Sequence, residues 1–363
     1  MDPAELLDYV VHEAVARGAS DVRLKVPSPP LVRINGCLAH LDVPAMTPAQ
    51  TEAILALLMA SLPTAAKQTH FDRVGEVDFA FTRREVGRFR INAFRQRGSI
   101  SIVMRVVPYG VRPLSELNLP PVVADVAESG SGLVLVCGPA SSGTTTTMAA
   151  MIDHVNRTQT RSIVTIEDPI EALHADNRSS IDQREVGLDT PSAADALASI
   201  LRQDADIVQI GHLGDPATTE AALHVAESGT LVIAGLSTND IFDAISRIVS
   251  MFPVHRQGVA RQSLAATLQA GLGMRQVRGP DGASRYPVVE ILRGTPQIRS
   301  ALASADPPEL LLELMASGES GMQTFEQALA RLVDADLADT DGAADVTRIG
   351  RIPRRGGAAA ARP

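Results

Sequence analysis

The chain has 363 residues, 45% apolar and 21% charged, which supplies a large buried core and predicts a globular protein of two domains. Its formal net charge of −9 argues against nonspecific electrostatic binding of nucleic acid. No apolar run approaches the roughly 20 residues that span a bilayer. Two cysteines, Cys37 and Cys137, give neither a disulfide framework nor a metal-ligand spacing, so the expected location is the cytoplasm.

The first 107 residues combine one helical pattern with several short β-like runs. Apolar residues at helical spacing predict a helix over 4–19, and alternating apolar residues predict strands. The expected strands are 21–26, 31–36, 77–81, 88–94 and 100–107. We therefore expect a small α+β domain over 1–107. Four prolines then predict a linker over 108–121, because each fixes its own φ and discourages helix before it.

From Leu133 the pattern changes to apolar, β-branched runs that alternate with helical segments. Such runs are typical of a parallel sheet covered by helices on both faces, so we expect an α/β domain over 122–335. Strands are expected at 133–137, 162–166, 206–211 and 230–236, and helices at 147–156, 193–203, 218–228, 243–252, 261–277, 311–318 and 322–337. The tail, 336–363, is low in complexity and is expected to be disordered.

A turn rich in glycine, serine and threonine, GPASSGTTTT at 138–147, follows the first strand of this domain. Gly138 and Gly143 have the spacing of a phosphate-binding loop, whose backbone N–H groups hold phosphates at a helix N-terminus. Thr145 stands at the hydroxyl position, which binds Mg²⁺, but Thr144 replaces the lysine that reaches the outer phosphates. Taken alone, the loop fits a phosphate site and a helix-capping turn equally well.

Ten stretches of the chain follow one another in a characteristic order. They are GASDVRL at 18–24, PPLVRING at 29–36, GRFRINAFRQ at 87–96, GLVLVCGP at 132–139, VTIEDPIEALH at 164–174, DQREVGLDT at 182–190, ALASILRQDADIVQIG at 196–211, AESGTLVIAGLSTND at 226–240, RIVSMFP at 247–253 and GTPQIRSAL at 294–302. Together they resemble the secretion ATPase superfamily, specifically the type IV pilus retraction ATPases of twitching motility. The resemblance covers about residues 1–335.

This resemblance implies a RecA-like P-loop NTPase domain preceded by a PAS-like domain. It implies ATP or ADP with Mg²⁺ as the cofactor and a hexameric ring, either homomeric or mixed with an active retraction ATPase. A platform protein of the pilus at the inner membrane would be a further partner. The subunit would then be cytoplasmic and peripheral at the inner-membrane base of the pilus, with no nucleic acid partner and no direct membrane insertion.

Position by position, the residues that this family uses for hydrolysis are largely replaced. His212 stands at the Walker B glutamate, Gly214 at the arginine of that motif, and Thr230 and Ser237 at the two histidines of the His box. Glu171, at the end of the acidic box, matches the family's catalytic base. The resemblance assigns the nucleotide to Gly138, Pro139, Ala140, Ser141, Ser142, Gly143, Thr144, Thr145 and Thr146, with Thr145 as the Mg²⁺ ligand.

Several of these residues also have a plain structural interpretation. Glu171 is either a general base or a solvated, ion-paired glutamate, and His212 is either a metal or proton-transfer group or hydrogen-bonded structure. Arginines on the strands of the first domain form a basic cluster, and in a ring some of them would reach a neighbour's nucleotide. The alternative is a solvated strand face with surface ion pairs. The candidates for this role in trans are Arg95, Arg97 and Arg105.

The replacements fall on several parts of one reaction centre, whereas the glycines and apolar runs that set the fold match the family pattern. No lysine follows Lys67, so the second domain has none to replace Thr144. The sequence therefore favours a nucleotide-binding pseudoenzyme in a pilus motor. A slow ATPase that powers pilus retraction or transport similar to type II secretion is the alternative, because Glu171 and Thr145 are retained. A nucleotide-sensing module is a third hypothesis.

Overall fold

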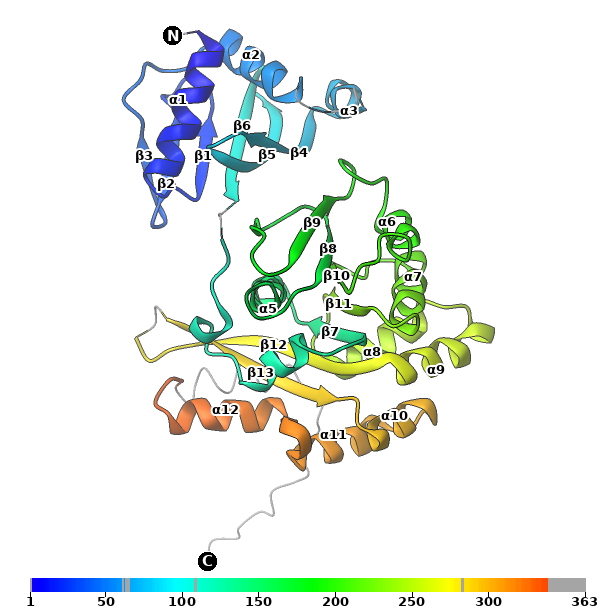
Figure 1. Cartoon of the computed structure of the whole chain (residues 1–363). Helices are drawn as coiled ribbons and strands as arrows, with labels where there is room; N and C mark the ends of the chain where they lie inside the picture. Colours follow the sequence, from blue (N-terminus) through cyan, green and yellow to red (C-terminus); the bar gives the residue numbers. More distant parts are fainter. Residues whose placement is uncertain (1, 61, 63–65, 108–109, 282–283, 339–363) are drawn as a thin grey trace, which may run out of the picture. The chain divides into compact units, whose positions relative to one another are not determined.

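The computed structural model describes residues 2–60, 62, 66–107, 110–281 and 284–338, and its contacts divide the chain into two compact units. The first unit runs to Val111 and also takes in two later segments, Pro169–Ala175 and Glu185–Asp189. The second holds Arg112–Asp168, Asp176–Arg184 and the chain from Thr190. Both units are drawn in Figure 1. Most of the predicted tail, 339–363, lies outside the described residues.

The first unit is built on a six-stranded sheet with the order β3-β2-β1-β6-β5-β4, and every neighbouring pair in it is antiparallel. Helices α1 and α2 pack against this sheet (Figure 1). The elements are α1 (Pro3–Ala16), β1 (Asp21–Leu24), β2 (Leu31–Ile34), β3 (Cys37–His40), α2 (Pro48–Met59), α3 (Ala66–Val74), β4 (Glu76–Arg83), β5 (Gly87–Gln96) and β6 (Ser99–Val107). The predicted α+β class of this domain is confirmed.

Local sequence explains where the two long helices of this unit begin. Asp2 and Thr47 cap α1 and α2, and in each case a side chain three residues on, Glu5 or Gln50, returns a hydrogen bond to the cap backbone. The apolar faces of the helices join the inner faces of the strands in one core. The sequence patterns predicted α1 but missed α2. The capping box of Thr47 and Gln50 and the apolar residues Leu55 and Leu58 are visible in the sequence and could have indicated this helix.

The second unit contains a seven-stranded sheet with the order β13-β12-β7-β11-β10-β8-β9. Strands β12, β7, β11, β10 and β8 pair in parallel, and β13 is antiparallel to β12. The strands are β7 (Gly132–Cys137), β8 (Ser162–Glu167), β9 (Ser180–Glu185), β10 (Ile207–Ile210), β11 (Leu231–Leu236), β12 (Leu268–Arg278) and β13 (Arg285–Arg293). Strand β7 is buried along its whole length, as expected for a sheet covered on both faces.

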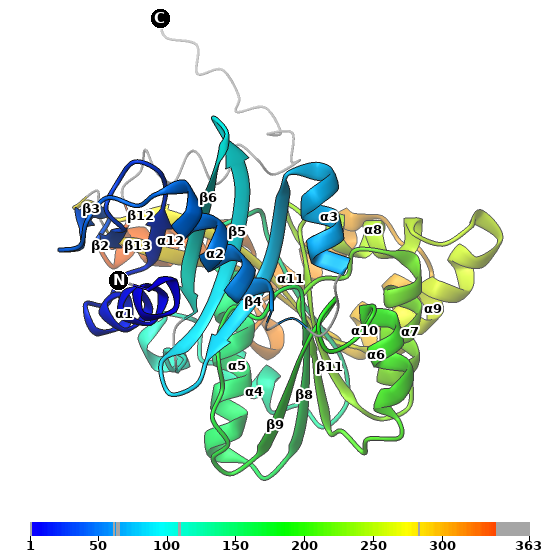
Figure 2. The same cartoon turned by 90° about the horizontal axis from the view of Figure 1, so that it is seen from above.

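Helices cover both faces of this sheet. Figures 1 and 2 show α5 on one face and α6 and α7 on the other, and α4 packs against α5, so the predicted α/β class is confirmed. The helices are α4 (Val122–Ala127), α5 (Thr144–Thr158), α6 (Ala193–Ile200), α7 (Pro216–Glu227), α8 (Ile241–Ser250), α9 (Gln257–Thr267), α10 (Pro296–Ala303), α11 (Pro308–Ala316) and α12 (Phe325–Asp334). Among the described helices, none is long and apolar enough to cross a bilayer.

The prediction of one helix over 261–277 was wrong beyond Thr267. There α9 ends, and the chain continues as β12, which is buried along most of its length. Gly271 packs against Ile241 and Gly273 against the side chain of Glu290, so closely that neither position has room for a Cβ atom. The small residues that seemed compatible with a helix therefore serve close packing within a strand.

Glu290 is an unusual buried acid at this point of the sheet. Its side chain on β13 is 3% exposed, and its Oε1 accepts a hydrogen bond of 2.7 Å from the backbone N–H of Ile241. Burial raises the pKa of Glu290 from 4.5 to about 8, and the nearby carboxylate of Asp240 adds to this effect while Arg275 opposes it. The folded protein therefore holds a proton that the unfolded chain releases near pH 4.5.

We expect Glu290 to make stability depend on pH. A raised folded-state pKa contributes stability below the unfolded value of 4.5, and that stability is lost as the pH rises toward about 8. The melting temperature of the wild type should fall between pH 5 and pH 8, and that of Glu290→Gln should fall less, because glutamine does not titrate. Glu313→Gln, at an exposed position, is the control. Parallel curves for wild type and Glu290→Gln would contradict the assignment.

Candidate functional site

The loop between β7 and α5 lies at the carboxyl edge of the parallel sheet. Gly138 follows the last residue of β7, and its backbone N–H donates to the carbonyl of Leu236 at the end of β11. A Cβ at Gly138 would stand 2.6 Å from the carbonyl oxygen of Met274, so only glycine fits there. Gly143, with φ of +98°, turns the chain into α5 through the left-handed region that favours glycine.

The N-terminus of α5 has backbone N–H groups that donate no hydrogen bond within the helix. Gly143 is its N-cap and offers no side chain, and the first backbone bond of the helix runs from the N–H of Thr147 to the carbonyl of Gly143. Ser142, only 3% exposed, has a buried Oγ with no hydrogen-bond partner among the described residues. Free N–H groups at a helix start and an unpaired buried hydroxyl together make a site suited to an oxyanion.

A cavity of about 360 Å³ adjoins this loop, within the size range of small-molecule sites. Of the nine predicted loop residues, Ser142, Gly143 and Thr146 line it, and Thr147, which was not predicted, does so too. Pro139, Ala140 and Ser141 are exposed, and Thr144 and Thr145 are half-buried at the start of α5. The other lining residues, from outside the loop, are Arg112, Glu116, Leu117, Asn118, Leu119, Met274, Gln276, Ser284, Arg285, Tyr286 and Pro287.

His212 follows β10 at the same edge of the sheet. Its side chain is exposed, and its pKa is lowered chiefly by partial desolvation of the ring and further by the positive charge of Arg247. The imidazole is therefore mostly neutral at pH 7 and cannot supply the negative charge of a glutamate. Asp215, at the end of the same motif, caps α7 by accepting hydrogen bonds from the backbone N–H and hydroxyl of Thr218, which lower its pKa.

Thr230 and Ser237, the two His-box positions, lie at opposite ends of β11. Ser237 follows the strand at the edge where the loop lies, and its carbonyl accepts a hydrogen bond of 3.0 Å from Arg247. Thr230 precedes the strand, and its carbonyl accepts from the N–H of Gly132 at the start of β7. At about 3.3 Å per residue, the length of β11 puts roughly 20 Å between them. The structure thus brings Ser237, but not Thr230, to the edge with the loop.

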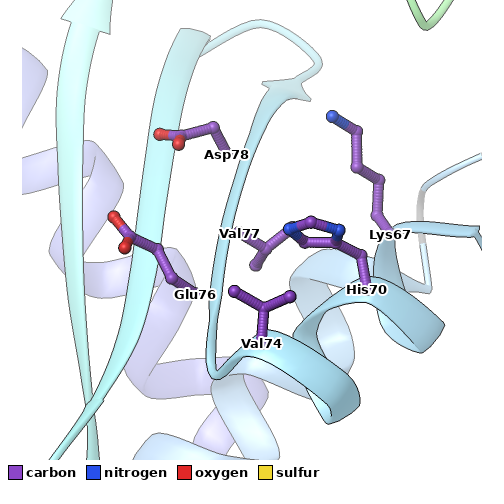
Figure 3. Close-up of a pocket in the computed structure, with 6 residues that line it drawn as sticks. All are labelled: Lys67, His70, Val74, Glu76, Val77 and Asp78. Carbon is purple, nitrogen blue, oxygen red and sulfur yellow. The ribbon is translucent and has the colours of Figure 1, made fainter.

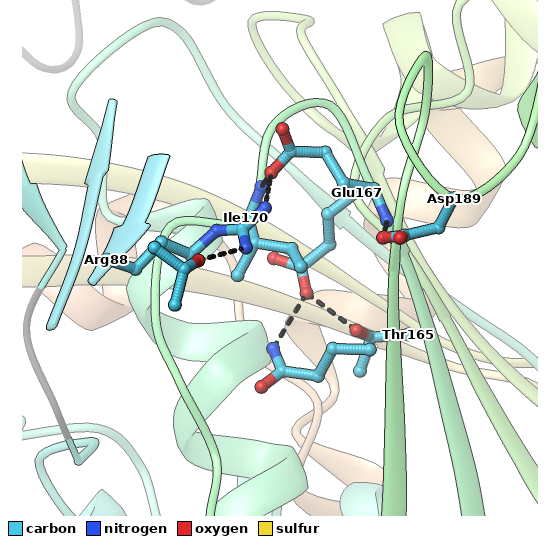
Figure 4. A network of polar contacts seen from close by, with 8 residues as sticks. Arg88, Thr165, Glu167, Ile170 and Asp189 are labelled. Atoms are coloured by element: carbon cyan, nitrogen blue, oxygen red, sulfur yellow. Dashed lines mark hydrogen bonds and ion pairs between the residues drawn. The ribbon is translucent and has the colours of Figure 1, made fainter. Parts of the chain in front are cut away.

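Glu167, the first residue of the acidic box that ends with Glu171, ends β8 as a buried carboxylate to which the sequence analysis assigned no role. Its Oε1 accepts hydrogen bonds from the hydroxyl of Thr165 at 2.6 Å and from the amide of Gln183 at 3.2 Å (Figure 4). The side chain is 6% exposed. It belongs to the second unit and, like the loop, stands at the carboxyl end of a parallel strand.

Glu171, the retained acidic-box glutamate, belongs to the first unit. Its carboxylate forms an ion pair of 3.3 Å with Arg90, and both side chains are well exposed, at 45% and 38%. Nearby in this unit, Arg88 and Glu185 form a much more buried pair at 2.6 Å (Figure 4). The geometry of Glu171 is that of a surface ion pair, and its role as a general base stays a prediction.

The three arginines predicted to act in trans have different surroundings. Arg105 pairs with Asp21 at 3.1 Å, and the guanidinium of Arg95 lies 5.0 Å from the ring centre of Phe71. Arg97 is exposed in the turn between β5 and β6, with φ of +46°. Arg97 is thus the most available of the three for an external ligand. A role in trans stays a prediction for all of them.

A second cavity, of about 460 Å³, lies between α3 and β4 of the first unit (Figure 3). Lys67 and His70 line it from the helix, and Glu76 and Asp78 from the strand. Both carboxylates accept hydrogen bonds from the amide of Asn92. These mixed charges do not favour an anion, and no group of three or more metal-ligating side chains occurs within the described part of the chain.

Comparisons with known proteins agree with one another. The family model described as "Type II/IV secretion system protein" matches residues 3–300. The type IV pilus retraction ATPase PilT of Pseudomonas aeruginosa is 34% identical over 96% of this chain and 99% of its own length, and a twitching motility protein of Neisseria gonorrhoeae is 36% identical over 86% and 83%. The crystal structure of the pilus retraction motor PilT with bound ADP superposes with a TM-score of 0.83 at 36% identity, covering 95% of this chain and 96% of that one.

Proposed function

The chain belongs to the type II/IV secretion system protein family, among its PilT-type pilus retraction ATPases, and on that premise we propose that it is a nucleotide-binding motor subunit that does not itself hydrolyse ATP. One observation carries the proposal. The loop begins with Gly138, where the backbone leaves no room for a side chain, and ends with Gly143, where φ is positive, while Thr144 stands where the family resemblance places a lysine.

Nucleotide binding is supported by the groups that surround this loop. The N-terminus of α5 and the unpaired Oγ of Ser142 offer donors to phosphate oxygens. Tyr286 and Met274 line the same cavity with less polar surface that suits a base or a ribose. The PilT structure to which this fold is similar contains ADP. ATP and ADP are therefore the proposed ligands, and Thr145 is the residue that would hold Mg²⁺ beside them.

The lack of hydrolysis is inferred from the groups that should stabilise the transition state. Phosphoryl transfer depends on positioning and on cations that neutralise developing charge, and a threonine hydroxyl at position 144 supplies no charge. His212 is mostly neutral and stands in place of a carboxylate. Binding of the ground state depends less on these groups than turnover does, so binding would survive where catalysis fails.

In this proposal the subunit joins a hexameric ring, either with its own copies or with an active retraction ATPase. The ring would sit at the inner-membrane base of a pilus and contact its platform protein. Relatives over almost the whole chain are pilus retraction and twitching motility proteins, which favours this setting. Co-purification from the native cell with a pilus platform protein or an active paralogue is the expected result. Recovery of neither, together with a monomeric protein, would contradict it.

A slow ATPase that drives pilus retraction or related transport is the second candidate. It is favoured by the buried carboxylate of Glu167, which Thr165 and Gln183 hold at the carboxyl end of β8. Together with the hydroxyl of Thr145, that carboxylate leaves some of the acceptors that a Mg²⁺ shell needs.

We expect purified protein with ATP and Mg²⁺ to release phosphate only at the background rate, while calorimetry on the same sample detects ADP binding. Two matched variants sharpen this test. Glu171→Ala should leave the rate unchanged, since it breaks only an exposed ion pair. Thr144→Lys combined with His212→Glu restores a cation and a carboxylate and should raise the rate if the fold is otherwise competent. Mg²⁺-dependent release by the wild type that Glu171→Ala abolishes would establish the slow ATPase instead.

A further inference from the structure

We propose that Arg112 and Arg285 supply the positive charge that the phosphate loop lacks, so that this chain binds a nucleoside di- or triphosphate through two arginines in place of one lysine. The inference rests on the proposed nucleotide binding and names the residues that would recognise the phosphates. Both arginines line the cavity that Ser142, Gly143 and Thr146 border from the loop side.

The two arginines reach this cavity from separate parts of the second unit. Arg112 is the first residue of that unit, just before the short 3₁₀ helix Leu114–Glu116, and Arg285 is the first residue of β13. Neither position belongs to a phosphate-loop motif, and they are 173 positions apart in the sequence, by subtraction of their residue numbers. Folding of the β12–β13 hairpin and of the linker is what places them at one cavity.

In the part of the chain that the structure describes, the charges of Arg112 and Arg285 are not neutralised by other side chains. Both side chains are exposed, and neither forms an ion pair or a side-chain hydrogen bond with another described residue. Two other arginines of this unit, by contrast, are engaged: Arg275 donates to the carbonyl of Asn239 and lies over the ring of Phe325, and Arg256 pairs with Glu220. Glu116 is the only acidic side chain among those that line the cavity, so positive charge predominates there.

The chemistry of the guanidinium explains why arginine suits binding without turnover. Arginine is always charged and presents a planar fork of donors that matches two phosphate oxygens, whereas lysine is a compact point charge. Cations at the mouth of a cavity would attract the whole di- or triphosphate chain, and they would help the ground state and the transition state alike. Such uniform binding lowers the dissociation constant without raising the rate.

The test compares Arg112→Gln, Arg285→Gln and the double variant with Arg202→Gln. This control lies in the turn after α6, where the exposed guanidinium of Arg202 donates to the carbonyl of Ala198. Calorimetry would measure ADP and adenosine for each protein. We expect the double variant to bind ADP about tenfold more weakly, with adenosine and the control unchanged. Adding Thr144→Lys to the double variant should recover the lost affinity, because the loop then carries its own cation.

Each other outcome has a definite meaning. Unchanged ADP affinity in the double variant, with a wild type that binds ADP, overturns this inference and leaves the proposed function standing. Equal weakening of ADP and adenosine also overturns it, because the arginines would then shape the cavity and not contact phosphates. A wild type that binds no ADP overturns the proposed nucleotide binding, and the inference with it.

Discussion

Thr144→Lys should bind ADP at least about 30-fold more tightly than the wild type, a gain of about 2 kcal/mol. The position is the first residue of α5, directly after the left-handed Gly143, so a long side chain starts from the N-terminus where the phosphates would lie. Its ammonium would add charge-assisted hydrogen bonds to a cradle that already offers backbone N–H groups and the Ser142 hydroxyl. Isothermal titration with ADP measures this change directly.

The same variant separates binding from catalysis. Because His212 still occupies the place of a carboxylate, we expect phosphate release by Thr144→Lys to stay at background even as its affinity rises. Thr158→Lys, at the exposed far end of α5, is the control for a nonspecific effect of added charge. An affinity unchanged by Thr144→Lys but raised by Thr158→Lys would show that ADP binds away from the loop.

Arg88→Met should destabilise the protein by about 3–5 kcal/mol, the usual cost of leaving one partner of a buried ion pair alone. Arg88 and Glu185 meet at 2.6 Å, with side chains only 11% and 6% exposed. The carboxylate of Glu185 also accepts from the backbone N–H of Ile170, which alone would not compensate a buried charge. Urea unfolding of both proteins at pH 7 gives the difference in unfolding free energy.

Two further variants make this measurement specific. Arg90→Met removes the arginine of the exposed pair with Glu171 and should cost less than about 1 kcal/mol. Arg88→Met with Glu185→Gln removes both charges of the buried pair and should recover much of the loss. Equal destabilisation by Arg88→Met and Arg90→Met would mean that burial does not govern the strength of these pairs.

Local patterns in the sequence predicted the features that depend on near neighbours. The apolar run 133–137 forms β7, an interior strand of the sheet, and the glycine spacing after it predicted the turn into α5. Local patterns failed where a residue must be small because a residue distant in the sequence packs against it. Gly271 and Gly273 looked compatible with a helix, yet they are small because Ile241 and Glu290 pack against their Cα atoms in a sheet.

The candidate site shows the same division. The loop residues could be predicted because their spacing identifies a phosphate-binding loop. Arg112 and Arg285 belong to no local sequence motif, and only tertiary folding places them at the same cavity as the loop. The ion pairs of Arg88 and Arg90 join residues 97 and 81 positions apart. A single sequence offers no way to match such partners, so neither the pair of Glu171 with Arg90 nor that of Glu185 with Arg88 could be predicted.

The two later segments of the first unit have a consequence for synthesis of the chain on the ribosome. Its sheet ends with β6 at Val107, but the partner of Arg88 lies in Glu185–Asp189, about 80 residues further on. At roughly 5–20 residues per second, the ribosome needs about 4–16 s to cover that distance. During this time the nascent N-terminal sheet lacks the partner of Arg88, and the Arg88 guanidinium stays in contact with water. The buried ion pair can form only after β7, α5 and β8 have been synthesised.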